Sequence, residues 1–354
     1  MADDTPIRLT TLSHGGGCGC KIAPAILDDI LDGLPRPFAD PALLVGNDSS
    51  DDAAVYRLDG DQALVATTDF FMPIVDDPFD FGRIAATNAL SDLYATGARP
   101  ILALAIVGMP IDKLPVAAIR QILAGGAAAC AAAEVAIAGG HSIDAPEPIY
   151  GLAAIGLAAP EHIKRNDTAQ TGDVLILGKP LGIGILSGAL QRGDLDESGY
   201  RELLETTTQL NKVGMALAKL SDVHVMTDVT GFGLLGHLLE ICRGSGLAAS
   251  VEFEALPILP TAYRLARDGA STGAAKRNWQ SFGHEVRLPA NIAPWGQSML
   301  CDPQTSGGLL VACAPQQAAA VLGMFHDNGF VSAAEIGEMM AGEAEVRVLS
   351  GEAA

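Results

Sequence analysis

The sequence has little positive charge, and this shortage limits the partners it can have. Its 354 residues include 22 lysines and arginines against 42 aspartates and glutamates, which gives a formal net charge of −20. A chain of this charge repels the phosphate backbone of nucleic acids and the surface of anionic lipids. We therefore expect neither a nucleic acid nor a membrane as a partner, and an acidic protein that uses a polyphosphate must recruit cations.

Long apolar segments are also missing. The longest apolar run, from Ile101 to Met109, is too short to span a bilayer. The first twenty residues lack the basic start and the apolar core of a signal peptide. The sequence accordingly predicts a cytoplasmic protein.

The cysteines do not form a pattern typical of a disulfide framework. The six are Cys18, Cys20, Cys130, Cys242, Cys301 and Cys313. In a chain this long such scattered positions favour free thiols in a reducing compartment. Three of them, Cys130, Cys242 and Cys313, have apolar neighbours in the sequence and are predicted to fill the core.

Reactive side chains are most closely spaced in residues 13–21, whose sequence is Ser-His-Gly-Gly-Gly-Cys-Gly-Cys-Lys. Glycine loses much backbone entropy on ordering, so four glycines within five positions indicate a loop that moves or approaches a ligand closely. Lys21 is expected to favour the thiolate form of a neighbouring cysteine. Two other interpretations remain open from the residues alone, a flexible linker and half of a metal site, although Cys-x-Cys with His14 supplies at most three ligands.

Helix and strand patterns alternate along the chain, which favours sheets covered by helices. In the first half we expect helices at 24–34, 81–97 and 114–133 and strands at 63–68, 101–108 and 149–157. In the second half we expect strands at 174–177, 223–226 and 308–313 and helices near 200–219, 233–243 and 315–328. These patterns predict two mixed α/β domains, divided near residues 160–170.

Acidic residues recur at the ends of predicted strands and on one helix face, where Asp92 follows Asn88 by one turn. They are Asp51, Asp52, Asp69, Asp92 and Asp228. Taken singly, each is well explained as a cap, a turn or a surface residue. Together they favour a site where magnesium bridges the protein to phosphate, because magnesium prefers oxygen ligands.

Two glycine patterns add weaker signals. Gly139 and Gly140 follow a predicted strand, where backbone N–H groups can cradle an anion, although His141 beside them is as well explained by a structural role. Residues 231–236, Gly-Phe-Gly-Leu-Leu-Gly, formally match a dinucleotide-binding fingerprint. An acid between the strand and these glycines, Asp228, would repel a pyrophosphate, so a dinucleotide site is disfavoured.

Seven segments together resemble bacterial selenophosphate synthetase, a family also called selenide, water dikinase. They are residues 13–21, 51–55, 67–73, 88–92, 139–148, 227–233 and 301–308. The resemblance runs from about residue 7 to beyond residue 340. It is specific, since related enzymes of the aminoimidazole ribonucleotide synthetase superfamily share the acids but lack Cys-Gly-Cys-Lys.

The resemblance implies the ATP-dependent conversion of selenide and water to selenophosphate, AMP and orthophosphate, with Mg²⁺ required. It assigns catalysis to Cys18 and Lys21. The positions that match the family's nucleotide-binding set are Lys21, Ser49, Ser50, Asp51, Asp69 and Asp92. The positions that match its metal ligands are Asp52, Asp92 and Asp228.

The resemblance also implies a mixed α/β (α+β) fold with two domains of the aminoimidazole ribonucleotide synthetase type. We expect a segment 1–48 that carries a mobile glycine-rich catalytic loop, an ATP- and metal-binding domain at 49–160 and an α/β domain at 168–350. The N-terminal sheets of two subunits are expected to close a barrel, so that Gly140, His141 and Ser142 contact the nucleotide of the partner in a homodimer. The stretch from Ala270 to Pro294 is expected to lie away from the motifs. Another ATP-dependent enzyme of the superfamily, or a thiol or metal sensor on an ATP-binding fold, remains the alternative.

Overall fold

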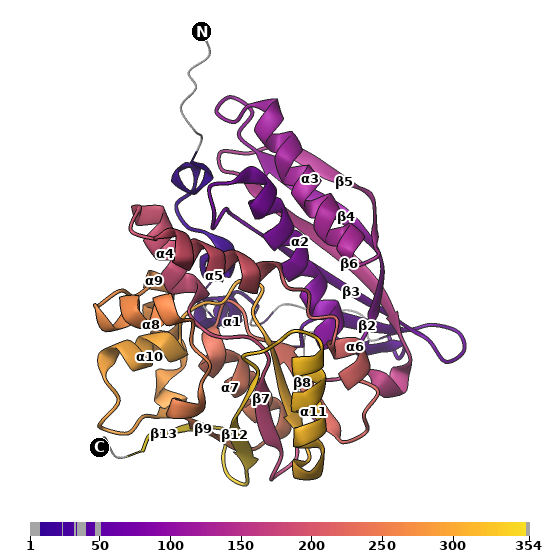
Figure 1. The fold of residues 1–354 in the computed structure, drawn as a ribbon. Coiled ribbons are helices and arrows are strands. Elements are labelled where there is room, and N and C mark those ends of the chain that lie inside the picture. Colours follow the sequence, from indigo (N-terminus) through magenta and orange to yellow (C-terminus); the bar gives the residue numbers. More distant parts are fainter. Residues whose placement is uncertain (1–7, 23, 32, 34–39, 47–50, 352–354) are drawn as a thin grey trace.

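The computed structural model describes residues 8–22, 24–31, 33, 40–46 and 51–351. Within them the chain forms one six-stranded sheet and one seven-stranded sheet, both accompanied by helices (Figure 1). The predicted mixed α/β fold is therefore confirmed. Ser49 and Ser50, two predicted nucleotide-binding residues, lie outside the described residues. No helix in the described part of the chain has both the length and the apolar composition needed to cross a membrane.

The first sheet has the strand order β1-β2-β3-β6-β4-β5. Its strands are β1 (Leu43–Val45), β2 (Ala54–Arg57), β3 (Ala63–Phe71), β4 (Arg99–Met109), β5 (Ala136–Asp144) and β6 (Ile149–Ala158). Only β4 and β5 pair in parallel, whereas the other neighbours are antiparallel. Two helices, α2 (Pro78–Ala95) and α3 (Val116–Ala132), lie side by side over one face of this sheet (Figure 1).

The second sheet has the order β10-β13-β9-β12-β7-β11-β8. Its strands are β7 (Val174–Leu177), β8 (Val223–Asp228), β9 (Ala248–Glu252), β10 (Val286–Arg287), β11 (Leu309–Cys313), β12 (Ala334–Met340) and β13 (Val346–Leu349). The helices of this half are α4 (Ile183–Arg192), α5 (Glu197–Thr208), α6 (Gly214–Leu217), α7 (Gly233–Ser245), α8 (Pro260–Arg267), α9 (Gly273–Phe282), α10 (Pro294–Leu300) and α11 (Pro315–Asp327). Before the first sheet, the chain forms a short 3₁₀ turn, η2 (Gly17–Cys20), and the helix α1 (Pro24–Leu31).

Two elements differ from the expectation. Strand β3 continues through Asp69 to Phe71, which pairs with Tyr150 of β6, so Asp69 lies inside a strand and not at its end. The helix expected near 200–219 is split into α5 and α6. Between them Asn211 is buried and donates hydrogen bonds from Nδ2 to Ser91 Oγ and to Gly307 O, which a continuous helix would not position in this way.

Helix α2 is the element that the two halves share. It packs on the first sheet and also contacts α5, α6 and β8 of the second half. Its first turn is fixed by Asp77, whose carboxylate accepts a hydrogen bond from Asp80 N, and by Pro78 directly after it. From Phe81 to Ala95 nearly every residue of α2 is buried. Side chains on this helix are therefore held firmly between the two sheets.

The close packing of α2 on α3 depends on glycine. A Cβ atom at Gly82 would lie 1.9 Å from Ile122 O, and one at Gly125 would lie 1.9 Å from Phe79 O. We expect Gly82→Ala to lower the free energy of unfolding by about 1–3 kcal/mol, because overpacking forces the two helix backbones apart. The urea midpoint, followed by circular dichroism, measures the change.

The matched control is Gly323→Ala on α11. A Cβ atom there would meet nothing within 4 Å, so the substitution is expected to be neutral or to stabilise by up to about 1 kcal/mol. Equal urea midpoints for the Gly82→Ala variant and the unaltered protein would contradict the packing argument.

Candidate active site

Carboxylates from four separate elements lie close together. Asp52 precedes β2, Asp69 lies in β3, Asp92 lies in α2 and Asp228 ends β8. Burial raises the pKa of Asp52 and that of Asp92 well above the usual range, and repulsion from Asp228 raises both further. Burial likewise raises the pKa of Asp228. The structure thus brings together the three residues that were predicted to hold a metal.

Hydrogen bonds fix two of these carboxylates. Thr67 Oγ1 donates to Asp92 Oδ2 at 2.5 Å, and Thr227 Oγ1 donates to Asp52 Oδ1 at 2.8 Å. By contrast, Asp228 Oδ2 is buried and accepts no hydrogen bond from any described residue. A buried carboxylate oxygen without a donor is costly, so it is suited to a cation.

The donor set therefore fits a hard divalent cation such as Mg²⁺, which binds carboxylate oxygens. Within the described part of the chain, however, no three His, Cys, Asp or Glu side chains already surround one point closely enough to hold a metal ion. The carboxylates of Asp52, Asp92 and Asp228 must turn toward a cation in order to bind it together.

Lys21 provides the positive charge beside these acids. Its Nζ lies 3.4 Å from Asp69 Oδ2, which also accepts a hydrogen bond of 2.7 Å from Asn88 Nδ2. Burial alone would lower the pKa of Lys21, but the nearby acids, Asp69 above all, raise it well above its usual value. Lys21 is therefore held as an ammonium group at the edge of the acidic cluster.

Cys18 is fully buried next to the same network. Its thiol donates to Asn88 Oδ1 at 3.3 Å, and its backbone N–H donates to Thr305 Oγ1 at 3.1 Å. Lys21 does lower the pKa of Cys18, as expected, but larger effects keep the thiol protonated. Burial, and after it repulsion from Asp69, raises the pKa of Cys18 well above its usual value, and the opposing effect of Lys21 is smaller.

The second thiol of the loop is held by the backbone. Cys20 Sγ donates to Gly17 O at 2.8 Å within the turn η2. Burial raises the pKa of Cys20 as well. Neither cysteine is thus prepared as a nucleophile while the loop is folded in this way.

The glycines of the loop permit close packing. A Cβ atom at Gly17, whose φ is +56°, would lie 2.2 Å from Thr305 Oγ1, and one at Gly16 would lie 2.4 Å from Pro73 O. The loop thus touches β3's continuation on one side and residues 301–308 on the other. The glycines were expected either to let the loop move or to let it approach a ligand closely. The structure shows a close approach, but to other parts of the protein.

The remaining predicted site residues lie elsewhere. Asp51 Oδ1 accepts a hydrogen bond of 2.7 Å from Asn166 N and so fastens the start of β2 to the segment between the sheets. Gly140, His141 and Ser142 lie exposed on β5, the edge strand of the first sheet. They do not line the cavity of about 430 Å³ beside Lys21, whose wall includes Cys20, Thr68 and Phe70.

Sequence reasoning noted Asn88 beside Asp92 but gave no site role to this residue, which links the site together. Asn88 Oδ1 accepts hydrogen bonds from the Cys18 thiol and from Ser306 N, and Asn88 Nδ2 donates one to Asp69. Its spacing one turn before Asp92 was the available signal. Thr305 was likewise missed, although it lies in a segment that carried the resemblance.

The stretch from Ala270 to Pro294 does not lie away from the motifs as expected. Arg277 Nη2 donates to Gly19 O at 3.1 Å, and Asn278 Nδ2 donates to Gly231 O at 2.9 Å. Helix α9 therefore packs against the glycine-rich loop of residues 13–21. The expectation was wrong because distance from motifs along the chain does not measure distance in the fold.

Comparison with known proteins agrees with this architecture. The family described as AIR synthase related protein, N-terminal domain, matches residues 50–158, and its C-terminal counterpart matches residues 170–349. Among solved structures, thiamine-monophosphate kinase from Stenotrophomonas maltophilia K279a superimposes with a TM-score of 0.63 at 23% identity, covering 87% of this chain and 91% of that one. Hydrogenase maturation protein HypE in complex with ATP superimposes with a TM-score of 0.62 at 21% identity, covering 88% and 87%. These two similarities show the fold.

Curated relatives are much more similar in sequence. The selenide, water dikinase of Burkholderia pseudomallei is 61% identical over 348 residues, 98% of each chain. That of Dechloromonas aromatica is 58% identical over 97% of this chain and 99% of its own, and that of Rhizobium meliloti is 54% identical over 97% and 98%. With two AIR synthase related domains and relatives of this identity over nearly its whole length, the chain belongs to the selenide, water dikinase family.

Proposed function

We propose that this chain synthesises selenophosphate from ATP, selenide and water and releases AMP and orthophosphate. One observation carries the proposal: Cys18 contacts Asn88 and Lys21 contacts Asp69, and Asn88 and Asp69 are hydrogen-bonded to each other at the edge of the acidic cluster. A thiol that can handle selenium thus lies beside an ammonium group that can bind phosphate. The curated relatives bear the corresponding name. Neither a thiol sensor nor another enzyme of the superfamily is favoured by these similarities.

The chemistry assigned to the protein is positioning and charge stabilisation, since phosphoryl transfer asks little covalent chemistry of side chains. Lys21 stabilises negative charge on the transferred phosphoryl group. Cys18 orients the selenium atom once the loop has released its thiol from Asn88. The packed loop excludes water from the reacting groups.

Mg²⁺ is proposed as the cofactor, with Asp52, Asp92 and Asp228 as its ligands, supported by the orphaned oxygen of Asp228. When bound, it supplies charge neutralisation to the triphosphate. For the nucleotide we propose Lys21, Asp69 and Asp92, with Ser49, Ser50 and Asp51 at the start of the same domain. The cavity that Lys21 and Asp69 line supports these two members of the set.

We also propose that the chain forms a homodimer. The domain boundaries 1–48, 49–160 and 168–350 and a cytoplasmic location are proposed separately. The face of the first sheet opposite α2 and α3 exposes apolar side chains, among them Phe70, Leu104 and Ile143. Apolar patches of this kind are typical of protein contacts. A second copy on this face would bring its Gly140, His141 and Ser142 toward the nucleotide, and a monomer in sedimentation equilibrium would contradict the proposal.

The function is tested by incubating the protein anaerobically with Mg-ATP, with and without selenide, and following phosphorus species by NMR. We expect AMP, orthophosphate and a phosphorus signal coupled to selenium, all dependent on selenide. ATP consumption that yields only ADP, or that ignores selenide, would exclude the proposed reaction.

Lys21→Ala is expected to lower the selenide-dependent rate at least about 100-fold, because a preorganised charge at the transferred group is lost. ATP binding, measured by titration calorimetry, should weaken much less than the rate. Lys219→Ala, which removes an exposed lysine of the second half, is the matched control and should retain the rate. Full activity of the Lys21→Ala variant would remove Lys21 from the mechanism.

The Asp228→Asn variant tests the proposed metal site through the effect of Mg²⁺ on thermal stability. Mg²⁺ is expected to raise the melting temperature of the unaltered protein, because a cation relieves repulsion among buried carboxylates. The variant has one charge fewer in the cluster, so it should melt at the same or a higher temperature without metal and should gain little from Mg²⁺. Melting curves with Mg²⁺ and with EDTA measure both effects.

The control for this experiment is Asp112→Asn, an exposed carboxylate on the loop after β4. It should respond to Mg²⁺ like the unaltered protein. An unchanged response to Mg²⁺ in the Asp228→Asn variant would place the cation elsewhere.

A further inference from the structure

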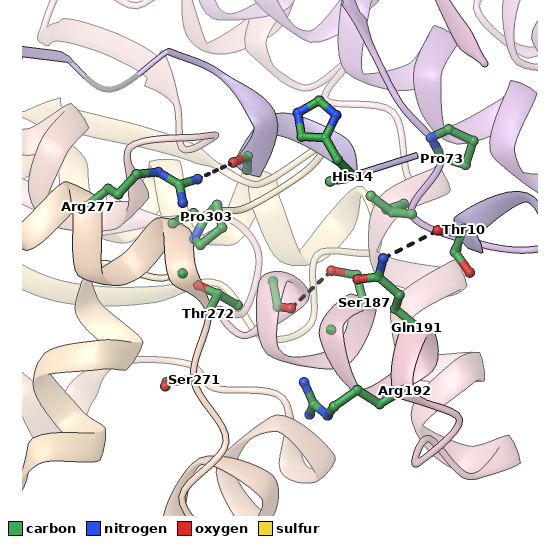
Figure 2. A pocket seen from close by; sticks show the side chains of 18 residues that line it. Thr10, His14, Pro73, Ser187, Gln191, Arg192, Ser271, Thr272, Arg277 and Pro303 are labelled. Carbon is green, nitrogen blue, oxygen red and sulfur yellow. Dashed lines mark hydrogen bonds between the residues drawn. The ribbon is translucent and has the colours of Figure 1, made fainter. Parts of the chain in front are cut away.

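A second cavity adjoins the catalytic loop on a different side from Lys21. It measures about 290 Å³, and its wall includes the backbone of Gly15, Gly16 and Gly19 (Figure 2). The cavity beside Lys21 is lined by none of these glycines. The loop therefore has a separate cavity on each of two sides, and Cys18, which is fully buried, lines neither.

Charge distinguishes this second cavity, which we call the arginine pocket. Its described lining residues include Arg192 and Arg277 but no aspartate or glutamate, whereas His14, which also lines it, has its Nδ1 2.9 Å from Glu147 Oε2. In a chain with 42 acids against 22 lysines and arginines, a wall of this composition is unusual. Guanidinium groups bind anions through directed hydrogen bonds, so the wall is suited to a negatively charged ligand.

The two arginines differ in how far their guanidinium groups are already paired with other groups of the protein. Arg192 Nε pairs with Asp194 at 3.2 Å, and both side chains are exposed to water. Arg277 has no ion-pair partner in the described part of the chain, and Gly19 O accepts its hydrogen bond. Figure 2 shows this bond at the boundary between the pocket and the loop. Most of the hydrogen-bonding capacity of Arg277 is therefore available to a ligand.

Further hydrogen-bond donors complete the wall. Ser271 and Ser187 of α4 line it, and the Ser187 hydroxyl already donates to Gly184 O at 3.0 Å (Figure 2), so Ser271 is the serine with a hydroxyl for a ligand. Helix α9 begins in the wall, where Thr272 Oγ1 accepts a hydrogen bond from Ala275 N. The positive end of this helix adds to the field of the arginines.

We propose that the arginine pocket binds the anionic selenium substrate, hydrogenselenide, without covalent chemistry, before that substrate reaches Cys18. This inference rests on the proposed function and names the place where its selenium substrate first binds. Hydrogenselenide is a small monoanion, and a cavity of about 290 Å³ holds it with several of its waters. An anion on Arg277 competes with Gly19 O for the guanidinium, which loosens the loop directly beside Cys18.

Orthophosphate, a product, has similar anion chemistry, so the experiment must separate the two. The first arm is anaerobic equilibrium dialysis with radiolabelled selenide and no ATP, in a Cys18→Ser background so that retained label is not covalently bound. We expect Arg277→Gln to weaken selenide binding at least tenfold. Arg201→Gln, which removes an exposed arginine of α5, is the charge-matched control and should bind as the parent does.

Gly188→Leu is a second variant that leaves every charge in place. Gly188 lies in α4 and lines the pocket, and a Cβ atom there would meet only Arg192 Nη1 at 3.4 Å. A leucine therefore occupies the pocket without straining the backbone, and selenide binding should again fall at least tenfold. Gly323→Leu on α11, where a Cβ atom meets nothing within 4 Å, controls for the glycine replacement.

The second arm is steady-state kinetics with Cys18 present. In the Arg277→Gln and Gly188→Leu variants the KM for selenide should rise at least tenfold, whereas the KM for ATP should change less than twofold. Unchanged selenide binding and an unchanged KM for selenide in both variants would overturn the proposal. It would also be overturned if the variants lost only their inhibition by orthophosphate, because the pocket would then be a site for the product. If the unaltered protein shows no selenide-dependent turnover, the proposed function fails, and the dialysis still decides whether the pocket binds selenide.

Discussion

Buried negative charge is the constraint on which the rest of this structure depends. The fold brings Asp52, Asp92 and Asp228 to one region beside Asp69, and burial and repulsion from neighbouring carboxylates oppose the ionisation of these three. Gathering like charges away from water costs free energy that a stable fold would avoid. One lysine, Lys21, offsets part of it through Asp69. The remainder favours binding of a cation, because a cation relieves the repulsion that destabilises the free protein.

The Asn88 amide connects this charged region to the thiol of Cys18. Asn88 uses its oxygen for Cys18 and Ser306 and its nitrogen for Asp69, and it lies on α2, which both halves of the molecule hold. The fully buried Lys179 donates a hydrogen bond of 2.8 Å to Ser306 O. This bond holds the backbone of Ser306, whose N–H binds Asn88, in place. A thiol, a carboxylate and a loop of the second half are thereby positioned relative to one another. Cys18 is fully buried, so exposing its thiol requires the loop to move and the hydrogen bond to Asn88 to break.

The sequence predicted the features that depend on local pattern. Strand β7, helix α7 and the position of Asp228 at the end of β8 follow from periodicity and from an acid after an apolar run. Features that depend on distant contacts could not be predicted. The split between α5 and α6 requires Asn211 to reach Ser91, and the extension of β3 requires a partner on β6.

The same distinction holds for the site. The acids and the thiol loop were recognisable from their residue types, whereas the pKa of Cys18 depends on burial that no local pattern reveals. Lys21 near Cys18 in the sequence suggests a thiolate, but the fold buries the thiol and places Asp69 beside both. Likewise, nothing near Arg277 in the sequence indicates that its guanidinium contacts the loop at Gly19.

The loop separates two cavities that differ in charge. One is lined by Lys21 and Asp69, whose opposite charges offset each other. The other is a pocket whose described wall carries arginines and no carboxylate. Two anions that must react with each other repel, and separate sites of this kind let each bind where the local field favours it. A backbone as slender as Gly-Gly-Cys-Gly then serves as the partition, because a side chain at Gly16 or Gly17 would collide with Pro73 or Thr305 and hold the loop away from both halves.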